Sequence, residues 1–147
     1  MENKNNYDSL SHSKFKIRYH IIFSTKYRRK LLRWPFSDTI KAYMLLSQEN
    51  QSDYKIELIE IDQSKPDHIH LLVQATPNIA PCDIIHKLKQ FSTYMCYKNN
   101  SGYMYKWYGI KHYLWTRGYF CCTIGDASIS TYKNILKIKD KMFYIKY

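Results

Sequence analysis

Hydrophobic and polar residues follow two periods along the chain, and the changes between them predict where strands and helices lie. From Phe15 to Phe23 apolar side chains occupy nearly every second position, which is the period of a half-buried strand. After Pro35 apolar positions recur at helical spacing, and they do so again after Asp83, which is a candidate N-cap. A strand near the start and two amphipathic helices are therefore expected.

Turn and loop signals separate the remaining elements. Residues 63–67 combine Ser, Pro and Asp between two apolar stretches, which predicts a hairpin of two strands. A later stretch rich in aromatic and basic residues is interpreted as a long loop, and Gly125 precedes a last segment with helical spacing. The expected segments are strands at 54–62, 69–73 and 119–124, a loop at 103–112 and a final helix around 129–138.

This order of elements predicts the fold class. Two βαβ-like halves with right-handed crossovers give an α+β fold, a ferredoxin-like βαββαβ sandwich. Its antiparallel sheet has the helices on one face, with an additional C-terminal helix, so the other face is available for function. The polar residues 1–13 are expected to be a flexible arm, and residues 14–147 are predicted to form a single domain.

The charge of the chain indicates a polyanionic partner. Its 147 residues include 23 Lys and Arg against 12 Asp and Glu, which leaves a net charge of +11. Nucleic acid is favoured over an acidic membrane surface, because aromatic residues that could stack on bases make up 16% of the chain. There is no apolar run long enough to span a membrane and no signal-peptide pattern, so we expect a soluble intracellular protein.

A pair of histidines supplies the clearest candidate chemistry. His68 and His70 are two positions apart at the strand predicted for 69–73, so their imidazoles should project from the same face. Two imidazoles side by side on a rigid strand form half of a divalent metal site, although two ordinary surface histidines are the simpler alternative. His20 and His86 are expected to pack or to contact phosphate, since neither has a neighbour at ligand spacing.

Three stretches in this order resemble the small single-tyrosine HUH transposases, the enzymes of insertion sequences that move as single-stranded DNA. They are YHIIFSTKYRRK at 19–30, DHIHLLV at 67–73 and WTRGYF at 115–120, and a weaker match lies at 84–90. The resemblance covers nearly the whole folded length of the chain. It implies a ferredoxin-like catalytic core, a homodimer and metal-dependent cleavage of single-stranded DNA at hairpin-marked ends.

The resemblance also implies a chemical role for the histidine pair. His68 and His70 would hold Mg²⁺ or Mn²⁺, which polarises the scissile phosphate while a tyrosine hydroxyl attacks and becomes a 5′-phosphotyrosine. The other product is a free 3′-OH, and a second 3′-OH can reseal the DNA because the covalent link retains the phosphodiester energy. Such a protein is expected in the cytoplasm, associated with the nucleoid when bound to DNA.

The last predicted helix leaves the identity of the nucleophile open. In the family that the chain resembles, this helix holds a tyrosine and, four residues later, a glutamine that completes the metal site. Counted from Gly125 without a gap, these positions fall on Ile135 and Lys139, which can perform neither role. The nearby tyrosine is Tyr132, and a shortened loop would bring it to the position of the nucleophile.

Two interpretations of Tyr132 follow. In the first, Tyr132 is the nucleophile, Leu136 takes the ligand position, and the missing oxygen ligand comes from Asp140, Glu60 or water. In the second, Tyr132 is a core residue of an impaired or repurposed relative that binds hairpin nucleic acid without cutting it. The retained histidine pair favours the enzyme, whereas the sequence of the last helix favours the binding protein.

A cluster of basic residues follows the first predicted strand. Interleaved aromatic rings, from Tyr27 and Trp34, favour a groove for the DNA backbone with stacking platforms, whereas a solvated loop is the alternative. Arg117 is assigned a phosphate contact by resemblance, with a surface salt bridge as its alternative. The basic residues of the cluster are Lys26, Arg28, Arg29, Lys30 and Arg33.

Overall fold

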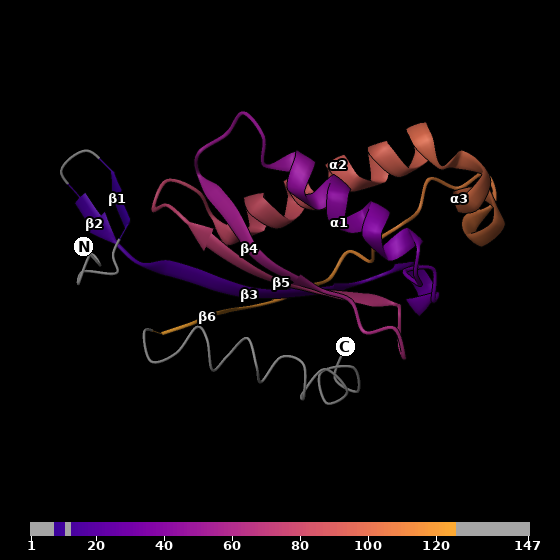
Figure 1. The fold of residues 1–147 in the computed structure, drawn as a ribbon, viewed down its shortest axis with the longest axis horizontal. Coiled ribbons are helices and arrows are strands. Elements are labelled where there is room, and N and C mark those ends of the chain that lie inside the picture. The colour runs from indigo at the N-terminus through magenta and orange to yellow at the C-terminus, as the bar shows by residue number, and fades with distance from the viewer. Residues whose placement is uncertain (1–7, 11–12, 126–147) are drawn as a thin grey trace.

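The computed structural model of the chain describes residues 8–10 and 13–125 (Figure 1). The predicted order of strands and helices is confirmed within these residues, and two short strands and one further helix are added to it. The elements are β1 (Asp8–Leu10), β2 (Ser13–Phe15), β3 (Ile17–Ser24), the 3₁₀ turn η1 (Lys26–Arg28), α1 (Phe36–Ser47), β4 (Tyr54–Glu60), β5 (His68–Ala75), α2 (Pro81–Asn99), α3 (Ser101–Tyr108) and β6 (Phe120–Thr123).

Four of the strands form one antiparallel sheet in the order β4-β5-β3-β6. The strands on either side of each helix are parallel to each other with a third strand between them, which is the ferredoxin-like arrangement that the sequence predicts. Helices α1 and α2 pack against each other and cover the same face of the sheet (Figure 1). None of the described helices combines the length and the apolar character needed to cross a lipid bilayer.

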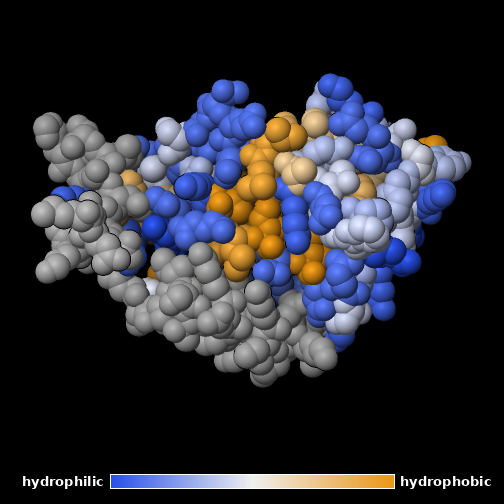
Figure 2. Space-filling view, viewed as in Figure 1, coloured by the Kyte–Doolittle hydropathy of each residue, from blue (hydrophilic) through white to orange (hydrophobic). Residues whose placement is uncertain are grey.

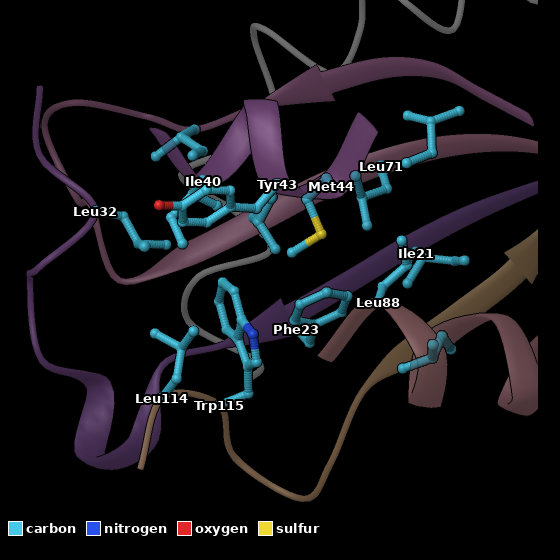
Figure 3. Packing of buried hydrophobic residues seen from close by; sticks show 14 of the residues in the cluster. Ile21, Phe23, Leu32, Ile40, Tyr43, Met44, Leu71, Leu88, Leu114 and Trp115 are labelled. Atoms are coloured by element: carbon cyan, nitrogen blue, oxygen red, sulfur yellow. The ribbon is translucent and has the colours of Figure 1, made fainter. Parts of the chain in front are cut away.

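The core lies between the sheet and the helices. Ile21 and Phe23 of β3 are at most 2% exposed, as are the apolar residues that alternate along β5. Figure 3 shows Phe23 among Met44, Leu88 and Trp115, and the Phe23 and Trp115 rings meet edge to face with centroids 4.7 Å apart. The core residues of β5 are Ile69, Leu71, Val73 and Ala75, so the residues between them face the other side of the sheet.

Two expectations from the sequence are wrong. Asp83 is not an N-cap, because α2 begins at Pro81, whose fixed φ suits the first helical turn. Asp83 lies in that first turn. The segment 103–112 is not a long loop, because residues up to Tyr108 belong to α3, which buries Met104 and Tyr108 one turn apart.

Part of the expected N-terminal arm pairs with the chain that follows it. Strand β1 is antiparallel to β2, with Asp8 opposite Phe15 and Leu10 opposite Ser13. Order within the described residues therefore begins before Lys14, where the sequence placed its start. The division into an arm and a single domain over 14–147 stays a prediction.

Lys89 connects helix α2 to the segment that leads into β6. Its Nζ donates hydrogen bonds to the carbonyl oxygens of Thr116 (2.8 Å) and Gly118 (2.9 Å), with a longer one to that of Arg117 (3.4 Å). The same ammonium lies 5.2 Å from the centroid of the Phe23 ring. Burial lowers the pKa of Lys89 to about 8, since the charged form loses hydration.

Lys89 should make the free energy of unfolding depend on pH. Its pKa is the ordinary 10.5 in the unfolded chain and about 8 in the folded protein, so between these values the unfolded state binds more protons and the free energy of unfolding rises with pH. Between neutral pH and about pH 10, the free energy of unfolding of the wild type should rise by on the order of 1–2 kcal/mol relative to that of Lys89→Met. Urea denaturation of both proteins measures this difference. A difference between the two proteins that stays constant over this range would contradict the lowered pKa.

Candidate metal and nucleic-acid site

The two predicted histidines lie together on β5, on the face of the sheet away from the core. His68 and His70 are 2% and 1% exposed, and their ring centroids are 5.1 Å apart. Their common face follows from the alternation along β5, in which Ile69 between them points into the core. The prediction that both imidazoles project from one face is therefore confirmed, but the rings are buried and are not ordinary surface histidines.

Asp67 fixes the orientation of His68. The fully buried Asp67 accepts a hydrogen bond at Oδ1 from Nδ1 of His68 (2.8 Å) and one at Oδ2 from Nε of Arg28 (3.3 Å). An ionised carboxylate is only an acceptor, so the proton of the neutral His68 ring lies on Nδ1 and the lone pair lies on Nε2. A carboxylate behind a histidine in this way is the usual support of a metal ligand.

His20 of β3 lies beside His70. Its Nε2 is 3.1 Å from Nδ1 of His70, and His20 is fully buried. This pair is not visible in the sequence, because the two histidines are 50 positions apart and meet only when β3 and β5 pair. The signal that could have found it is the alternation in β3, which places His20 on the side opposite to Ile21 and Phe23.

The histidine pair fits two positions of a divalent metal site. Both rings have Nδ1 engaged by a neighbouring side chain, so Nε2 is the nitrogen that each would offer to a cation. Glu60 is opposite His70 in the β4–β5 ladder. No group of three or more His, Cys, Asp and Glu residues that could hold a metal occurs within the part of the chain that the structure describes, so Glu60 does not complete the site there. Tyr132 and Asp140 lie outside the described residues.

A strained turn follows β3 and separates two of the predicted DNA-binding residues. Tyr27 and Arg28 have φ angles of 60° and 54°, a left-handed conformation that residues other than glycine rarely adopt. The turn is held by Thr25, whose Oγ1 donates to the carbonyl of Arg29 (2.6 Å) and whose N–H donates to the carbonyl of Asp67 (2.9 Å). Arg28 points back to Asp67, whereas Tyr27 is 63% exposed.

The other basic residues of the turn gather with aromatic rings from α3 and the segment after it. Lys26 lies over Tyr113 at 5.1 Å from the ring centroid, and Arg29 lies over Tyr108 at the same distance. Figure 2 shows blue hydrophilic residues alternating with pale residues of intermediate hydropathy over the end of the molecule that holds η1 and α3. Together with the exposed Lys30, which follows Arg29 in the chain, these residues form what we call the basic aromatic cluster: Lys26, Tyr27, Arg29, Lys30, Arg33, Trp107, Tyr108 and Tyr113.

Arg117 lines a surface depression together with Lys26 and Tyr113 of this cluster. The depression has a volume of about 450 Å³, and Arg117 itself is exposed. Gln90 and Thr93 of α2 and His112 give its wall hydrogen-bonding groups. The sequence-predicted residues thus occupy two places: the buried histidine face, which includes Arg28, and an exposed basic surface.

Comparison with known proteins agrees with this arrangement. The family model described as IS200-like transposase matches residues 13–137. The transposases for insertion sequence element IS200 of Salmonella typhimurium and Salmonella typhi are each 28% identical to this chain over 139 residues, which cover 95% of this chain and 81% of theirs. The ISDra2 transposase TnpA of Deinococcus radiodurans is 33% identical over 75 residues, or 51% of each chain.

A solved structure confirms the fold independently. A crystal structure from Deinococcus radiodurans R1, assigned provisionally as a transposase, superposes with a TM-score of 0.67 at 22% identity and covers 90% of this chain and 97% of its own. The family model includes the histidine pair and the turn after β3 as well as most of the remaining chain. The chain therefore belongs to the IS200-like transposase family.

Proposed function

We propose that this transposase cuts and rejoins single-stranded DNA at the ends of an insertion sequence, through a 5′-phosphotyrosine intermediate, with Mg²⁺ or Mn²⁺ held by His68 and His70. The observation that carries the proposal is the buried histidine pair, in which Nδ1 of each ring meets a neighbouring side chain. Burying two polar imidazole rings on the face away from the core lowers the stability of the fold, which favours a functional reason for their burial.

Four residues at the histidine face, His68, His70, Asp67 and Arg28, have tasks in this reaction. A bound divalent ion would polarise the scissile phosphate and offset the negative charge that develops on it. His68 and His70 would hold that ion, and Asp67 keeps His68 in the ligating orientation. Arg28 donates to the second oxygen of Asp67, which helps to hold the carboxylate turned toward His68.

Tyr132 is our provisional nucleophile. Its phenol oxygen would form a bond to phosphorus while the bond from phosphorus to the 3′ oxygen breaks. The phenol loses a proton, and the departing oxygen gains one to give a free 3′-OH. A phenol has an ordinary pKa of about 10, so it needs a nearby cation to react at neutral pH. Attack by another 3′-OH reverses these bond changes and rejoins the DNA.

The basic aromatic cluster supplies a surface for the DNA partner. Four of its cations, Lys26, Arg29, Lys30 and Arg33, can contact phosphates, and Tyr27 is exposed enough to stack on a base. Arg28 is not counted among them, because it is bonded to Asp67. We infer that the partner is single-stranded DNA with hairpin ends, that two copies of the chain act as a homodimer, and that the protein acts in the cytoplasm, at the nucleoid when bound to DNA.

The second candidate function is a repurposed transposase that binds hairpin nucleic acid without cutting it. The observation that favours it is the sequence of the last predicted helix, where Ile135 and Lys139 stand at the ungapped positions of the nucleophile and the third ligand. Both candidates require the basic aromatic cluster, but only the enzyme requires a tyrosine near the histidines. A covalent adduct therefore distinguishes them.

Purified protein should form a covalent adduct with labelled single-stranded DNA that contains the ends of its element, in the presence of Mn²⁺. Mass mapping should place the adduct on Tyr132, and both Tyr132→Phe and His68→Ala should abolish it, because one lacks the nucleophile and the other a metal ligand. An adduct on another tyrosine would support the proposed reaction but would assign the nucleophile to that tyrosine and not to Tyr132. DNA binding without an adduct under any divalent metal would favour the repurposed protein.

Binding to single-stranded DNA should depend steeply on salt. Four phosphate contacts predict a slope of log affinity against log salt of about −2.8, since each contact contributes about −0.7 on single strands. Lys30→Ala should reduce the slope by about 0.7. Lys55→Ala, which removes an exposed cation on the edge strand β4, is the matched control and should leave it unchanged. Equal slopes for wild type and Lys30→Ala would exclude a phosphate contact at Lys30.

A further inference from the structure

The contact between His20 and His70 has a consequence for the proposed metal site. We propose that His20 is a positioning residue that accepts a hydrogen bond from Nδ1–H of His70, and so holds His70 in the tautomer whose Nε2 lone pair can bind a divalent cation. The inference rests on the proposed function in one respect, the assignment of the cation to His70. The arrangement of the two rings is independent of that assignment.

The geometry is that of an in-plane hydrogen bond between two imidazoles. Nε2 of His20 and Nδ1 of His70 are 3.1 Å apart, and the ring planes differ by 12°. The ring centroids are 5.4 Å apart, a spacing that places the rings edge to edge through the facing nitrogens and not one above the other. Both rings are buried, at 0% and 1% exposure, so bulk water does not compete for the hydrogen bond between them.

One proton lies between the two nitrogens. The nitrogen to which it is bonded decides whether Nε2 of His70 can bind a cation. If His20 donates, Nδ1 of His70 accepts, and the neutral His70 ring carries its own proton on Nε2. That tautomer has no Nε2 lone pair for a cation. If His70 donates from Nδ1, its Nε2 carries the lone pair and can be a ligand. Metal binding by His70 therefore requires His20 to accept.

His20 has the same relation to His70 that Asp67 has to His68. In both cases a side chain meets Nδ1 of the histidine, at 3.1 Å and at 2.8 Å respectively. Asp67 can only accept when ionised, so it fixes the tautomer of His68 by itself. An imidazole can donate or accept, so the choice at His70 depends on how His20 is held. The edge contact of Phe120 with the His20 ring, at a centroid distance of 5.9 Å, contributes to that placement.

The tautomers are measured directly by the ¹⁵N chemical shifts of the histidine rings in the full-length, metal-free protein, at a pH well above the ordinary histidine pKa of about 6.5. The expected result is that His68 and His70 are both protonated at Nδ1 and that Nε2 of His20 has no proton. Protonation of His70 at Nε2 would overturn the proposal. This measurement decides the tautomer whether or not the wild type binds a metal.

Variants of His20 then test the effect on the cation. The free Mn²⁺ signal in electron paramagnetic resonance gives the affinity, and His20→Leu, which removes the acceptor, should weaken Mn²⁺ binding about 10- to 100-fold. His20→Gln, whose side-chain oxygen can accept the same hydrogen bond, should restore affinity to within a few-fold of wild type. His86→Leu, on the exposed side of α2, is the matched control and should leave the affinity for Mn²⁺ unchanged.

The outcomes separate the two proposals. Wild-type affinity in a folded His20→Leu variant, or equal losses in His20→Leu and His20→Gln, would overturn the positioning role of His20. Absence of Mn²⁺ binding by the wild type would instead overturn the metal assignment in the proposed function, and the ring shifts of His70 would still decide its tautomer. Circular dichroism melting of each variant shows whether it is folded under the conditions used.

Discussion

The antiparallel pairing of β3 with β5 is the constraint on which the rest of the structure depends. In this register Ile22 is opposite His70 and Ser24 is opposite His68. The same pairing puts Ile21 and Phe23 into the core together with the alternate residues of β5. A shift of the β5 register by one residue would turn the histidines into the core and the apolar side chains of β5 to the other face. Burial of these apolar side chains therefore also fixes the face from which the histidines project.

Asp67 connects the histidine face to the exposed basic surface. One of its oxygens holds His68 and the other holds Arg28, while its carbonyl accepts from the backbone of Thr25. The left-handed residues Tyr27 and Arg28 cost conformational energy, and these contacts offset it. As a result, the exposed Tyr27 lies in a turn whose neighbouring residues Thr25 and Arg28 are hydrogen-bonded to Asp67, the partner of His68. DNA bound at the basic aromatic cluster would thus lie at a defined position relative to the histidine pair.

The sequence predicted the sheet, two helices and the shared face of His68 and His70, because strict alternation and helical spacing are local signals. It missed α3, since the aromatic and basic residues that make up five of its eight positions hide the spacing of Met104 and Tyr108. It also missed the contact of His20 with His70, which depends on strand register and not on spacing along the chain. The contact of Arg28 with Asp67 is likewise not visible in the sequence, because the two residues are 39 positions apart.

The central claim is that His68 and His70 bind one divalent cation through Nε2, with Asp67 and His20 behind them. The most direct measurement is anomalous X-ray diffraction at the manganese edge from crystals of the full-length protein grown with Mn²⁺. We expect a single anomalous peak within bonding distance of Nε2 of both histidines, and we expect this peak to be lost in His68→Ala. A peak elsewhere on the molecule, or a map without a peak at this face, would contradict it.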